Sequence, residues 1–170
     1  MPFDRLVRTV DQWAGTRGRS DVFAQIGLTN YRPSSIQWTK FLQPAEFKHR
    51  CQTARVIVAH AGTGSIITAL QLGKPILIMP RRASLRETRN DHQVATAKQF
   101  RRFGSVVVAW DEKELLARLE EVDNLDGRRA VGSYASRELI EAVREFVVDG
   151  ASTLDEWEEG TWTPPGPRAG

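Results

Sequence analysis

Three short hydrophobic runs, at residues 56–59, 76–79 and 106–109, stand out because no polar residue interrupts them. Runs of this kind are typical of strands buried on both faces, as in a parallel sheet that lies between helices. Two further runs, at 22–26 and 36–42, are bounded by a glycine and by a proline and also predict strands. The pattern therefore predicts five strands.

Segments with hydrophobic residues at helical spacing separate these strands. Asp111 and Glu114 form a capping-box pattern, and Asp91 follows polar residues ahead of an apolar face, so both aspartates mark helix starts. The predicted helices span residues 3–13, 44–53, 65–72, 91–103, 112–122 and 134–148. Because strands and helices alternate, the predicted fold class is α/β: a Rossmann-like parallel sheet with helices on both faces.

The length of 170 residues suits one domain with a substantial core. From Asp149 onward the composition turns to Gly, Pro, Glu and Trp in irregular order. We therefore expect a domain at 1–149 and a flexible C-terminal tail at 150–170. Trp157 and Trp162 in this tail could dock on a partner or on the protein itself.

Charge and cysteine content narrow the classes of function. The net charge is +3, and 19 of the 24 basic residues are arginine, but acidic residues are mixed among them. The long basic stripe of a nucleic-acid-binding protein is therefore missing. Cys51 is the single cysteine, and it is either a core residue or a reactive thiol. With no signal peptide, membrane-length apolar run or internal disulfide, the expected location is the cytoplasm.

The strand predicted at 56–59 leads into a loop of small residues, His60-Ala61-Gly62-Thr63-Gly64-Ser65, that opens a helix. Glycines let the backbone approach a ligand closely, and the first turn of a helix offers unpaired N–H groups and the positive end of its dipole. The sequence thus predicts a site for a pyrophosphate group. The alternative is a tight turn between strand and helix that binds no ligand.

The loop does not match three better-known motifs. A Walker loop requires Lys after its second glycine, where Ser65 and then Ile66 stand. A dinucleotide fingerprint requires a small residue at the position of Ile67. Ser65 also lacks the flanking glycines of a hydrolase nucleophile elbow. ATP hydrolysis by a P-loop, NAD binding and serine hydrolysis are therefore not supported.

Five short blocks follow one another in fixed order. They are Phe41-Leu42 with Pro44 and Glu46-Phe47, His60-Ala61-Gly62-Thr63-Gly64-Ser65, Leu72-Gly73-Lys74-Pro75, Pro80-Arg81 and Asn90-Asp91-His92-Gln93. With these blocks, the segment from about Pro2 to about Leu119 resembles the C-terminal domain of glycosyltransferase family 28. It is most similar to the small stand-alone members, which are the donor-binding half of two-subunit transferases in bacterial exopolysaccharide assembly and in dolichol-linked N-acetylglucosamine transfer.

The resemblance implies the C-terminal half of a GT-B fold and a role as donor-binding subunit of an inverting hexosyltransferase. A UDP-sugar would be its substrate, with neither a metal nor another cofactor. A membrane-anchored partner subunit would supply the lipid-linked acceptor and the general base, so no catalytic residue is assigned in this chain. The protein would then be cytoplasmic and peripheral at the inner face of the membrane.

By the same resemblance, the backbone near Leu42 contacts the uracil, the Gly62–Ser65 loop holds the diphosphate, and Asp91 and Gln93 bind the sugar hydroxyls. Many relatives grip the ribose with a glutamate at the position of Thr68, and a hydroxyl brings no charge to that contact. The donor-binding candidates are Leu42, His60, Gly62, Thr63, Gly64, Ser65, Thr68, Arg81, Asp91 and Gln93.

Several of these residues have plainer explanations. His60 could contact a phosphate or merely bond a neighbouring carbonyl, and Asp91 could simply cap its helix. His92 could be an ordinary surface histidine. The arginines of one loop form either a solvated surface or a cluster that favours an acidic sugar such as glucuronate. These are Arg81, Arg82, Arg86 and Arg89.

Family members usually begin with a strand and a Gly-Thr turn ahead of the segment that matches Pro2 to Leu6, and this sequence contains neither. In a doubly wound sheet that strand would be central, so its neighbours would lose a hydrogen-bonding partner. There are three alternative explanations for this difference from the family. The coding start could be placed too far downstream, the domain could close up differently, or another segment could fill the gap. A nonenzymatic subunit that binds nucleotide or a partner therefore remains an alternative function. A UDP-sugar epimerase is less consistent with the sequence, because it would need a second Rossmann domain.

Overall fold

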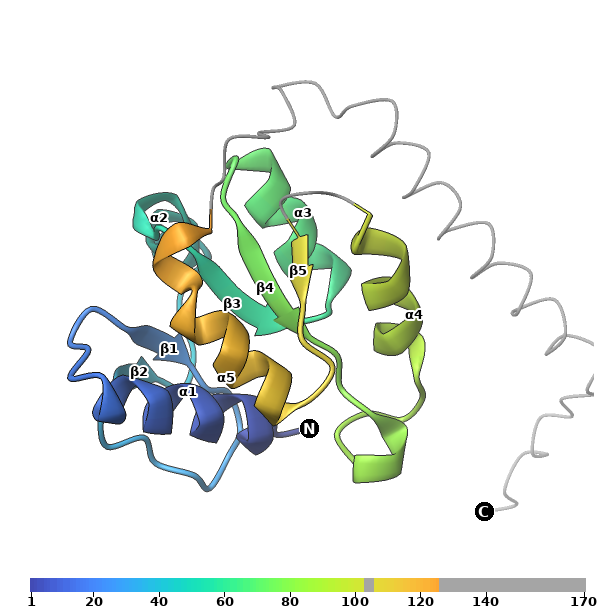
Figure 1. Ribbon diagram of the computed structural model, residues 1–170, viewed down its shortest axis with the longest axis horizontal. Helices are drawn as coiled ribbons and strands as arrows, with labels where there is room; N and C mark the ends of the chain where they lie inside the picture. Colours follow the sequence, from blue (N-terminus) through green and yellow to red (C-terminus); the bar gives the residue numbers. More distant parts are fainter. Residues whose placement is uncertain (103–105, 126–170) are drawn as a thin grey trace, which may run out of the picture. The chain divides into compact units, whose positions relative to one another are not determined.

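The computed structural model describes residues 1–102 and 106–125. In this part, parallel strands alternate with helices, which confirms the predicted α/β class (Figure 1). The elements are α1 (Asp4–Thr16), β1 (Phe23–Gln25), β2 (Gln37–Thr39), α2 (Pro44–Thr53), β3 (Ile57–His60), α3 (Thr63–Gln71), β4 (Ile76–Met79), the 3₁₀ turn η1 (Ala83–Leu85), α4 (His92–Phe100), β5 (Val106–Val108), α5 (Glu112–Glu120) and the 3₁₀ turn η2 (Val122–Asn124). The helix predicted at 134–148, the tail at 150–170 and both of its tryptophans lie outside the described residues.

The strands form two separate parallel sheets. One sheet has the order β3-β4-β5, with Ile57 of β3 opposite Ile76 of β4 and Ile76 opposite Val106 of β5. The other contains only β1 and β2, with Phe23 opposite Gln37. The β3-β4-β5 sheet is parallel, as its uninterrupted hydrophobic runs predict, whereas β1 and β2 form a parallel pair of their own instead of joining one five-stranded sheet.

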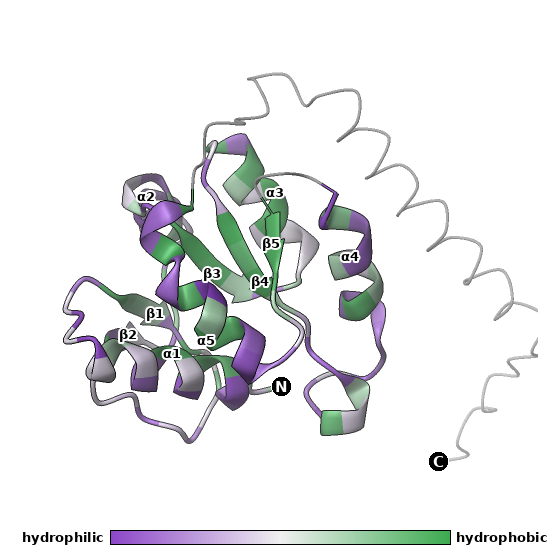
Figure 2. Cartoon of the chain, in the orientation of Figure 1, coloured by the Kyte–Doolittle hydropathy of each residue, from purple (hydrophilic) through white to green (hydrophobic). Residues whose placement is uncertain are grey.

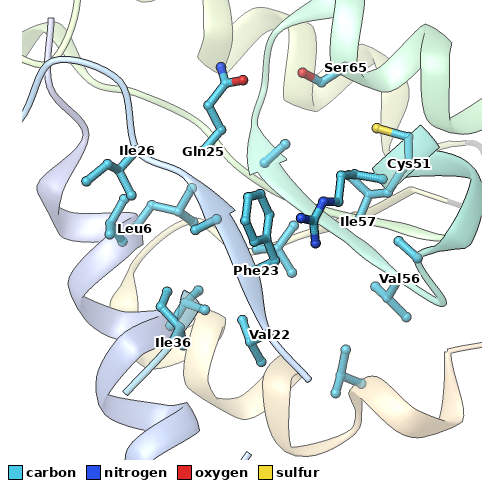
Figure 3. Close-up of a pocket in the computed structure, with 18 of the residues that line it drawn as sticks. Leu6, Val22, Phe23, Gln25, Ile26, Ile36, Cys51, Val56, Ile57 and Ser65 are labelled. Atoms are coloured by element: carbon cyan, nitrogen blue, oxygen red, sulfur yellow. The ribbon is translucent and has the colours of Figure 1, made fainter. Parts of the chain in front are cut away.

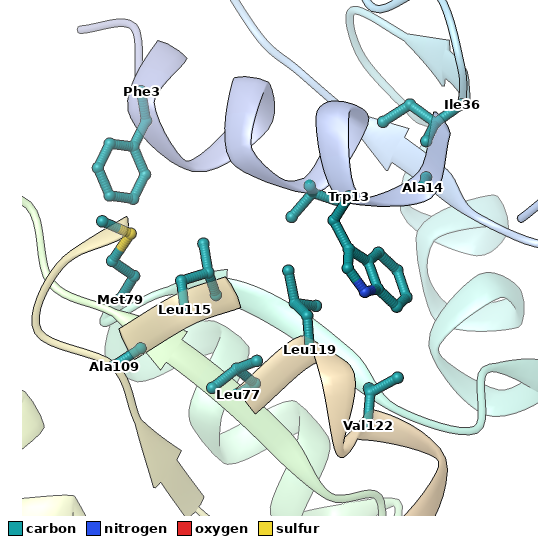
Figure 4. Close-up of a cluster of buried hydrophobic side chains, with 11 residues drawn as sticks. Phe3, Trp13, Ala14, Ile36, Leu77, Met79, Ala109, Leu115, Leu119 and Val122 are labelled. Atoms are coloured by element: carbon teal, nitrogen blue, oxygen red, sulfur yellow. The ribbon is translucent and has the colours of Figure 1, made fainter. Parts of the chain in front are cut away.

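The core is built around β4, whose four residues are all buried. Figure 2 shows the hydrophobic character of the β3-β4-β5 sheet against the polar outer surfaces of α1 and α5. Leu77 and Met79 of β4 pack in one cluster with α1 and α5 (Figure 4). Side chains alternate along a strand, so Ile76 and Ile78 face the other side of the sheet, against which α3 packs. Burial on both faces explains why this segment contains no polar residue.

Helices α1 and α5 lie against each other on one side of this sheet (Figure 1). Trp13 of α1 and Leu115 and Leu119 of α5 fill the space between them (Figure 4). Helix α5 begins where the capping-box pattern predicts, because the Asp111 carboxylate accepts the Glu114 N–H at 2.8 Å. None of the helices within residues 1–102 and 106–125 combines the length and the apolar character needed to cross a bilayer.

The ends of several elements differ from the sequence prediction. Helix α2 and strand β4 have the predicted bounds, whereas α1 continues to Thr16 and α4 ends at Phe100. The largest difference concerns the strand predicted at 36–42, which ends at Thr39. Beyond this point the Leu42 N–H donates to the Gln25 side chain at 3.1 Å instead of to a neighbouring strand. A side chain thus replaces the strand ladder just before α2.

No strand in the described part of the chain lies between β1 and β3. A cavity of about 510 Å³ lies there instead, lined by residues 22–26 on one side and 53–60 on the other. Strand β3 is only half-buried along its length, although β4 beside it is fully buried. Within the described residues, the two sheets therefore remain separate.

Candidate functional site

Four of the ten predicted donor-binding residues share one cavity near the carboxyl ends of the strands. Leu42, His60, Ser65 and Arg81 all line the cavity between the two sheets, together with Gln25 at the end of β1. In Figure 3, Gln25 and Ser65 lie toward one end of the cavity, and Val22 and Val56, which precede β1 and β3, lie away from it. The carboxyl edge of a parallel sheet is where such folds bind ligands.

The loop after β3 presents backbone N–H groups at the start of α3. The helical hydrogen bonds begin with Ile66, whose N–H donates to the Gly62 carbonyl at 3.2 Å. The amides of Thr63, Gly64 and Ser65 therefore precede the first helical bond and stand at the positive end of the helix dipole. This arrangement can receive an anionic group such as a phosphate.

The two glycines of this loop have different surroundings. A Cβ added at Gly62 would lie only 2.8 Å from Nδ1 of His60, and closer still to the Cε1 atom of the same ring. A Cβ added at Gly64 would have no atom within 4 Å. Gly62 is thus required by the packing of His60, whereas the space in front of Gly64 is open to a ligand.

His60 lies in a small polar cluster with Gln93 and Arg81. Its imidazole interacts with the Gln93 side chain, and Nδ1 is buried without a hydrogen-bonding partner among the described residues. Gln93 in turn accepts the backbone N–H of Arg81 at 3.2 Å. Burial and the Arg81 charge lower the pKa of His60, against the effect of the Gln93 hydrogen bond. The ring is therefore neutral near pH 7 and keeps one unused nitrogen beside the loop.

Arg81 holds the chain terminus beside this cluster. Its Nη1 donates to the Met1 carbonyl at 3.0 Å, while Nε is buried with no partner in the described part of the chain. Burial lowers the pKa of Arg81, and the nearby Glu87 charge partly restores it. Arg81 thus combines a structural contact with one unused donor next to the candidate site.

The other predicted residues make bonds within the protein. Asp91 stands at the N-cap position of α4, but its side chain does not cap that helix and instead accepts the Ala83 N–H at 2.9 Å. Thr68 donates its hydroxyl to the Gly64 carbonyl at 2.8 Å. The amide of Leu42 is bonded to the Gln25 side chain. A ligand at these positions would have to compete with these bonds or add to them.

Sequence analysis missed the residues that hold the loop between β4 and α4. The buried Glu87 carboxylate accepts bonds from Arg5 at 2.8 and 2.9 Å and from the Arg82 N–H at 3.0 Å. Arg5 also donates to the Pro80 carbonyl at 3.2 Å. Helix α1 is thereby fixed to the loop that precedes Asp91. Arg5 and Glu87 are 82 residues apart, so no local pattern could have predicted the pair.

The four arginines of this loop divide into two groups. Arg81 and Arg82 are half-buried, and Arg82 donates to the Trp110 carbonyl at 2.6 Å. Arg86 and Arg89 are exposed. The first two arginines therefore fold the loop, and only the exposed pair matches the predicted solvated surface.

Comparison with known proteins identifies the domain. Residues 2–128 match the model of the glycosyltransferase family 28 C-terminal domain. The chain belongs to this family. The match covers β1 to α5 and includes all ten candidate donor-binding residues.

A curated relative of this glycosyltransferase domain is the UDP-N-acetylglucosamine transferase subunit ALG13 of Candida albicans. The two chains are 28% identical over 98 residues, which is 58% of this chain and 32% of the relative. The matched region therefore spans about a third of the length of that relative.

Two solved structures align with this chain, and one of them does so at a TM-score above 0.5. The crystal structure of the glycotransferase of kitacinnamycin aligns with a TM-score of 0.56 and 20% identity, over 86% of this chain and 38% of that one. The spinosyn forosaminyltransferase SpnP aligns with a TM-score of 0.48 and 20% identity, over 87% of this chain and 37% of that one. At this level of identity, the first likeness supports the Rossmann-like GT-B architecture and says nothing of the substrate.

Proposed function

We propose that this chain is the donor-binding subunit of an inverting glycosyltransferase and that it holds a UDP-sugar at the carboxyl edge of β3. The observation that carries the proposal is the start of α3, where the amides of Thr63, Gly64 and Ser65 precede the first helical hydrogen bond and a Cβ added at Gly64 would meet no atom within 4 Å. Family membership supports the same placement, because a family 28 glycosyltransferase domain uses an activated sugar. UDP-N-acetylglucosamine is the proposed donor, since the matched ALG13 is named as a transferase subunit for it.

In this proposal the amides of Thr63, Gly64 and Ser65 bind the diphosphate. The leaving diphosphate gains negative charge in the transition state, so fixed N–H groups would stabilise that state more than the bound substrate. One helix terminus contributes only about 0.3–1 kcal/mol at an exposed site, whereas micromolar affinity requires about 8 kcal/mol. Contacts to the uracil near Leu42 and to the sugar near Asp91 and Gln93 would have to supply most of the affinity.

His60 gives the proposal a proton-linked feature. Burial and the Arg81 charge favour the neutral ring of His60, whose Nδ1 has no hydrogen-bonding partner among the described residues. A diphosphate bound at the loop would favour the protonated ring and raise the pKa of His60. Binding of UDP would then take up a proton and become tighter as the pH falls toward about 6.

The acceptor side of the reaction is assigned to a partner. The name of the relative describes a subunit, and we extend this to the present chain: a membrane-anchored partner would bring a polyprenyl-linked saccharide and the general base. The chain would then lie at the inner face of the membrane through that partner. Bacterial exopolysaccharide assembly and dolichol-type glycan assembly both fit such an acceptor.

Titration calorimetry with the full chain tests the donor site. UDP, UDP-N-acetylglucosamine, UDP-glucose and UDP-glucuronate are compared, because a clear preference for glucuronate would favour an acidic sugar beside Arg86 and Arg89. Gly64→Val should weaken UDP binding at least about tenfold by filling the open space. Gln71→Val is the matched control, since Gln71 is exposed at the far end of α3. Equal affinities of the two variants, or no binding of any nucleotide, would overturn the proposal.

A nonenzymatic subunit is the second candidate. It is favoured by Thr68, whose hydroxyl already donates to the Gly64 carbonyl, and by one edge each of β1 and β3 that pairs with no strand of the described residues. The two candidates differ in a transfer assay with membranes that contain the partner subunit. Sugar transfer that depends on addition of this chain supports the enzyme, and a partner complex that binds no UDP supports the scaffold.

A further inference from the structure

The side chain of Gln25 occupies one of the two backbone groups of Leu42. Gln25 is the last residue of β1, and its Oε1 atom accepts the Leu42 N–H at 3.1 Å. A peptide nitrogen only donates, so this bond fixes which end of the Gln25 amide faces Leu42. In Figure 3 the Gln25 side chain extends from the end of β1 toward the end of the cavity at which Ser65 lies. The bond therefore lies at the carboxyl edge, where such sheets bind ligands.

This bond is not part of the strand pairing. The backbone ladder between β1 and the segment that follows β2 continues with the N–H groups of Ile26 and Gly27, each 2.9 Å from its carbonyl acceptor. The bond from Leu42 to Gln25 comes after these, and both the bond and the Gln25 side chain are exposed. A hydrogen bond in contact with water adds little to stability, because water can replace either partner. Breaking it therefore costs the fold little.

The carbonyl group of Leu42 is available as well. Among the described residues it accepts no hydrogen bond. The backbone of Leu42 thus offers one donor, which Gln25 occupies, and one free acceptor. Uracil is complementary to such a pair, because its O4 oxygen accepts and the adjacent N3–H donates. A uracil base at Leu42 would place O4 where Oε1 of Gln25 now lies.

We propose that Gln25 is a specificity-determining residue that closes the base site of the ligand-free chain: its side-chain oxygen holds the Leu42 N–H until the O4 oxygen of a uracil nucleotide displaces it. The inference rests on the proposed function, since it takes the base of a UDP-sugar to bind near Leu42. Only molecules in which Gln25 has turned away are competent to bind the base. The apparent affinity for the nucleotide is reduced by the fraction of such molecules.

The competition favours one kind of base. Cytosine carries an amino group where uracil carries O4, and an amino group cannot accept the Leu42 N–H. A cytosine nucleotide would have to displace Gln25 without replacing the lost bond. Uracil restores that bond and adds a second one to the Leu42 carbonyl. Gln25 therefore acts against bases of the wrong pattern, which is how specificity is commonly increased.

Titration calorimetry of the full chain with UDP, CDP and inorganic pyrophosphate tests this role. Gln25→Ala should strengthen UDP binding about two- to fivefold, because the competitor for the Leu42 N–H is gone. CDP should gain less than UDP. Pyrophosphate should bind equally well to both chains, because the amides at the start of α3 do not involve Gln25. Gln37→Ala, at an exposed position at the start of β2, is the matched control and should change none of these affinities.

A second variant should have the opposite effect. In Gln25→Glu a carboxylate accepts the Leu42 N–H, and such charge-assisted bonds are stronger than neutral ones. UDP binding should weaken at least about threefold, and it should weaken more than pyrophosphate binding, which reports the effect of the added charge alone. In the ligand-free chain, NMR should show faster exchange of the Leu42 amide in Gln25→Ala than in the original protein.

The outcomes separate this inference from the proposed function. If the original chain binds UDP and Gln25→Ala binds it equally well or more weakly, the inference is overturned and the donor site is not. Equal gains for UDP and pyrophosphate would also overturn it, because the effect would not concern the base. The same holds for an unchanged exchange rate of the Leu42 amide in Gln25→Ala. No binding of UDP or pyrophosphate by the original chain would overturn the proposed function and this inference together.

Discussion

Replacing Gly62 by alanine tests the contact between the loop and His60. The added methyl group would lie 2.8 Å from Nδ1 of His60, well inside ordinary van der Waals contact. The ring has little room to turn away, because it is half-buried. Overpacking of this kind costs about 1–3 kcal/mol. Gly62→Ala should therefore destabilise the domain by about 2 kcal/mol.

Thermal unfolding followed by circular dichroism measures the effect. A loss of about 2 kcal/mol lowers Tm by about 4–8 °C for a protein of this size. Gly64→Ala is the matched control, because its methyl group meets no atom within 4 Å. Alanine is the better helix former by about 1 kcal/mol, so this variant should be at least as stable as the original protein. It should nevertheless bind UDP more weakly.

A double substitution separates the steric effect from others. Truncating the ring in His60→Ala removes the atoms that the new methyl group meets, so Gly62→Ala should cost much less in that background. If Gly62→Ala alone has an unchanged Tm, the ring does not lie against the loop. If the double variant loses the full sum of both single effects, the cost has another origin.

Three further predictions concern buried groups. The folded-state pKa of His60 lies below its unfolded value of about 6.5, so the unfolded chain binds more protons than the folded chain as the pH falls. The free energy of unfolding should therefore decrease below about pH 6.5. Denaturation curves of His60→Gln should show a smaller decrease over the same pH range. Glu87→Gln should cost about 3 kcal/mol in urea denaturation, because it leaves the buried Arg5 charge poorly paired, and an unchanged midpoint would contradict this. Burial raises the pKa of the Cys51 thiol. A disulfide reagent should therefore react at least about tenfold more slowly with the folded chain than with the chain unfolded in urea. Equal reaction rates would show that the thiol is not buried.

Local patterns predicted much of the fold. The run Ile76–Met79 was predicted with its bounds because every residue in it is buried, and Pro44 marks the start of α2 since proline fits the first turn of a helix. The Asp111 cap likewise appears as predicted. The strand at 36–42 was overextended because the Leu42 amide donates to the side chain of Gln25, a residue on another strand that no local pattern points to.

In the candidate site too, some features follow from consecutive residues and others depend on residues that are far apart in the sequence. The Gly62–Ser65 loop was predictable because a strand end, two glycines and a helix start are consecutive in sequence. The support of the Arg81 loop was not, because it depends on the pairing of Arg5 with Glu87 across 82 residues. Glu87 also accepts the Arg82 N–H, so the same carboxylate shapes the turn that leads to Asp91 and Gln93.

Through the Arg5–Glu87 pair, helix α1 thus positions the loop that leads to Asp91 and Gln93, the proposed sugar-binding residues, without contacting the sugar itself. If Arg5 serves to fix the loop, Arg5→Met should weaken binding of a UDP-sugar more than binding of UDP, because the diphosphate amides on α3 do not depend on the Arg5–Glu87 pair. Arg17→Met is a suitable control, since Arg17 pairs with Glu120 on the surface at the far end of α1. Calorimetry with UDP and with UDP-N-acetylglucosamine gives the two affinities. An equal loss for both ligands would show that the ion pair supports the whole domain and not the loop in particular.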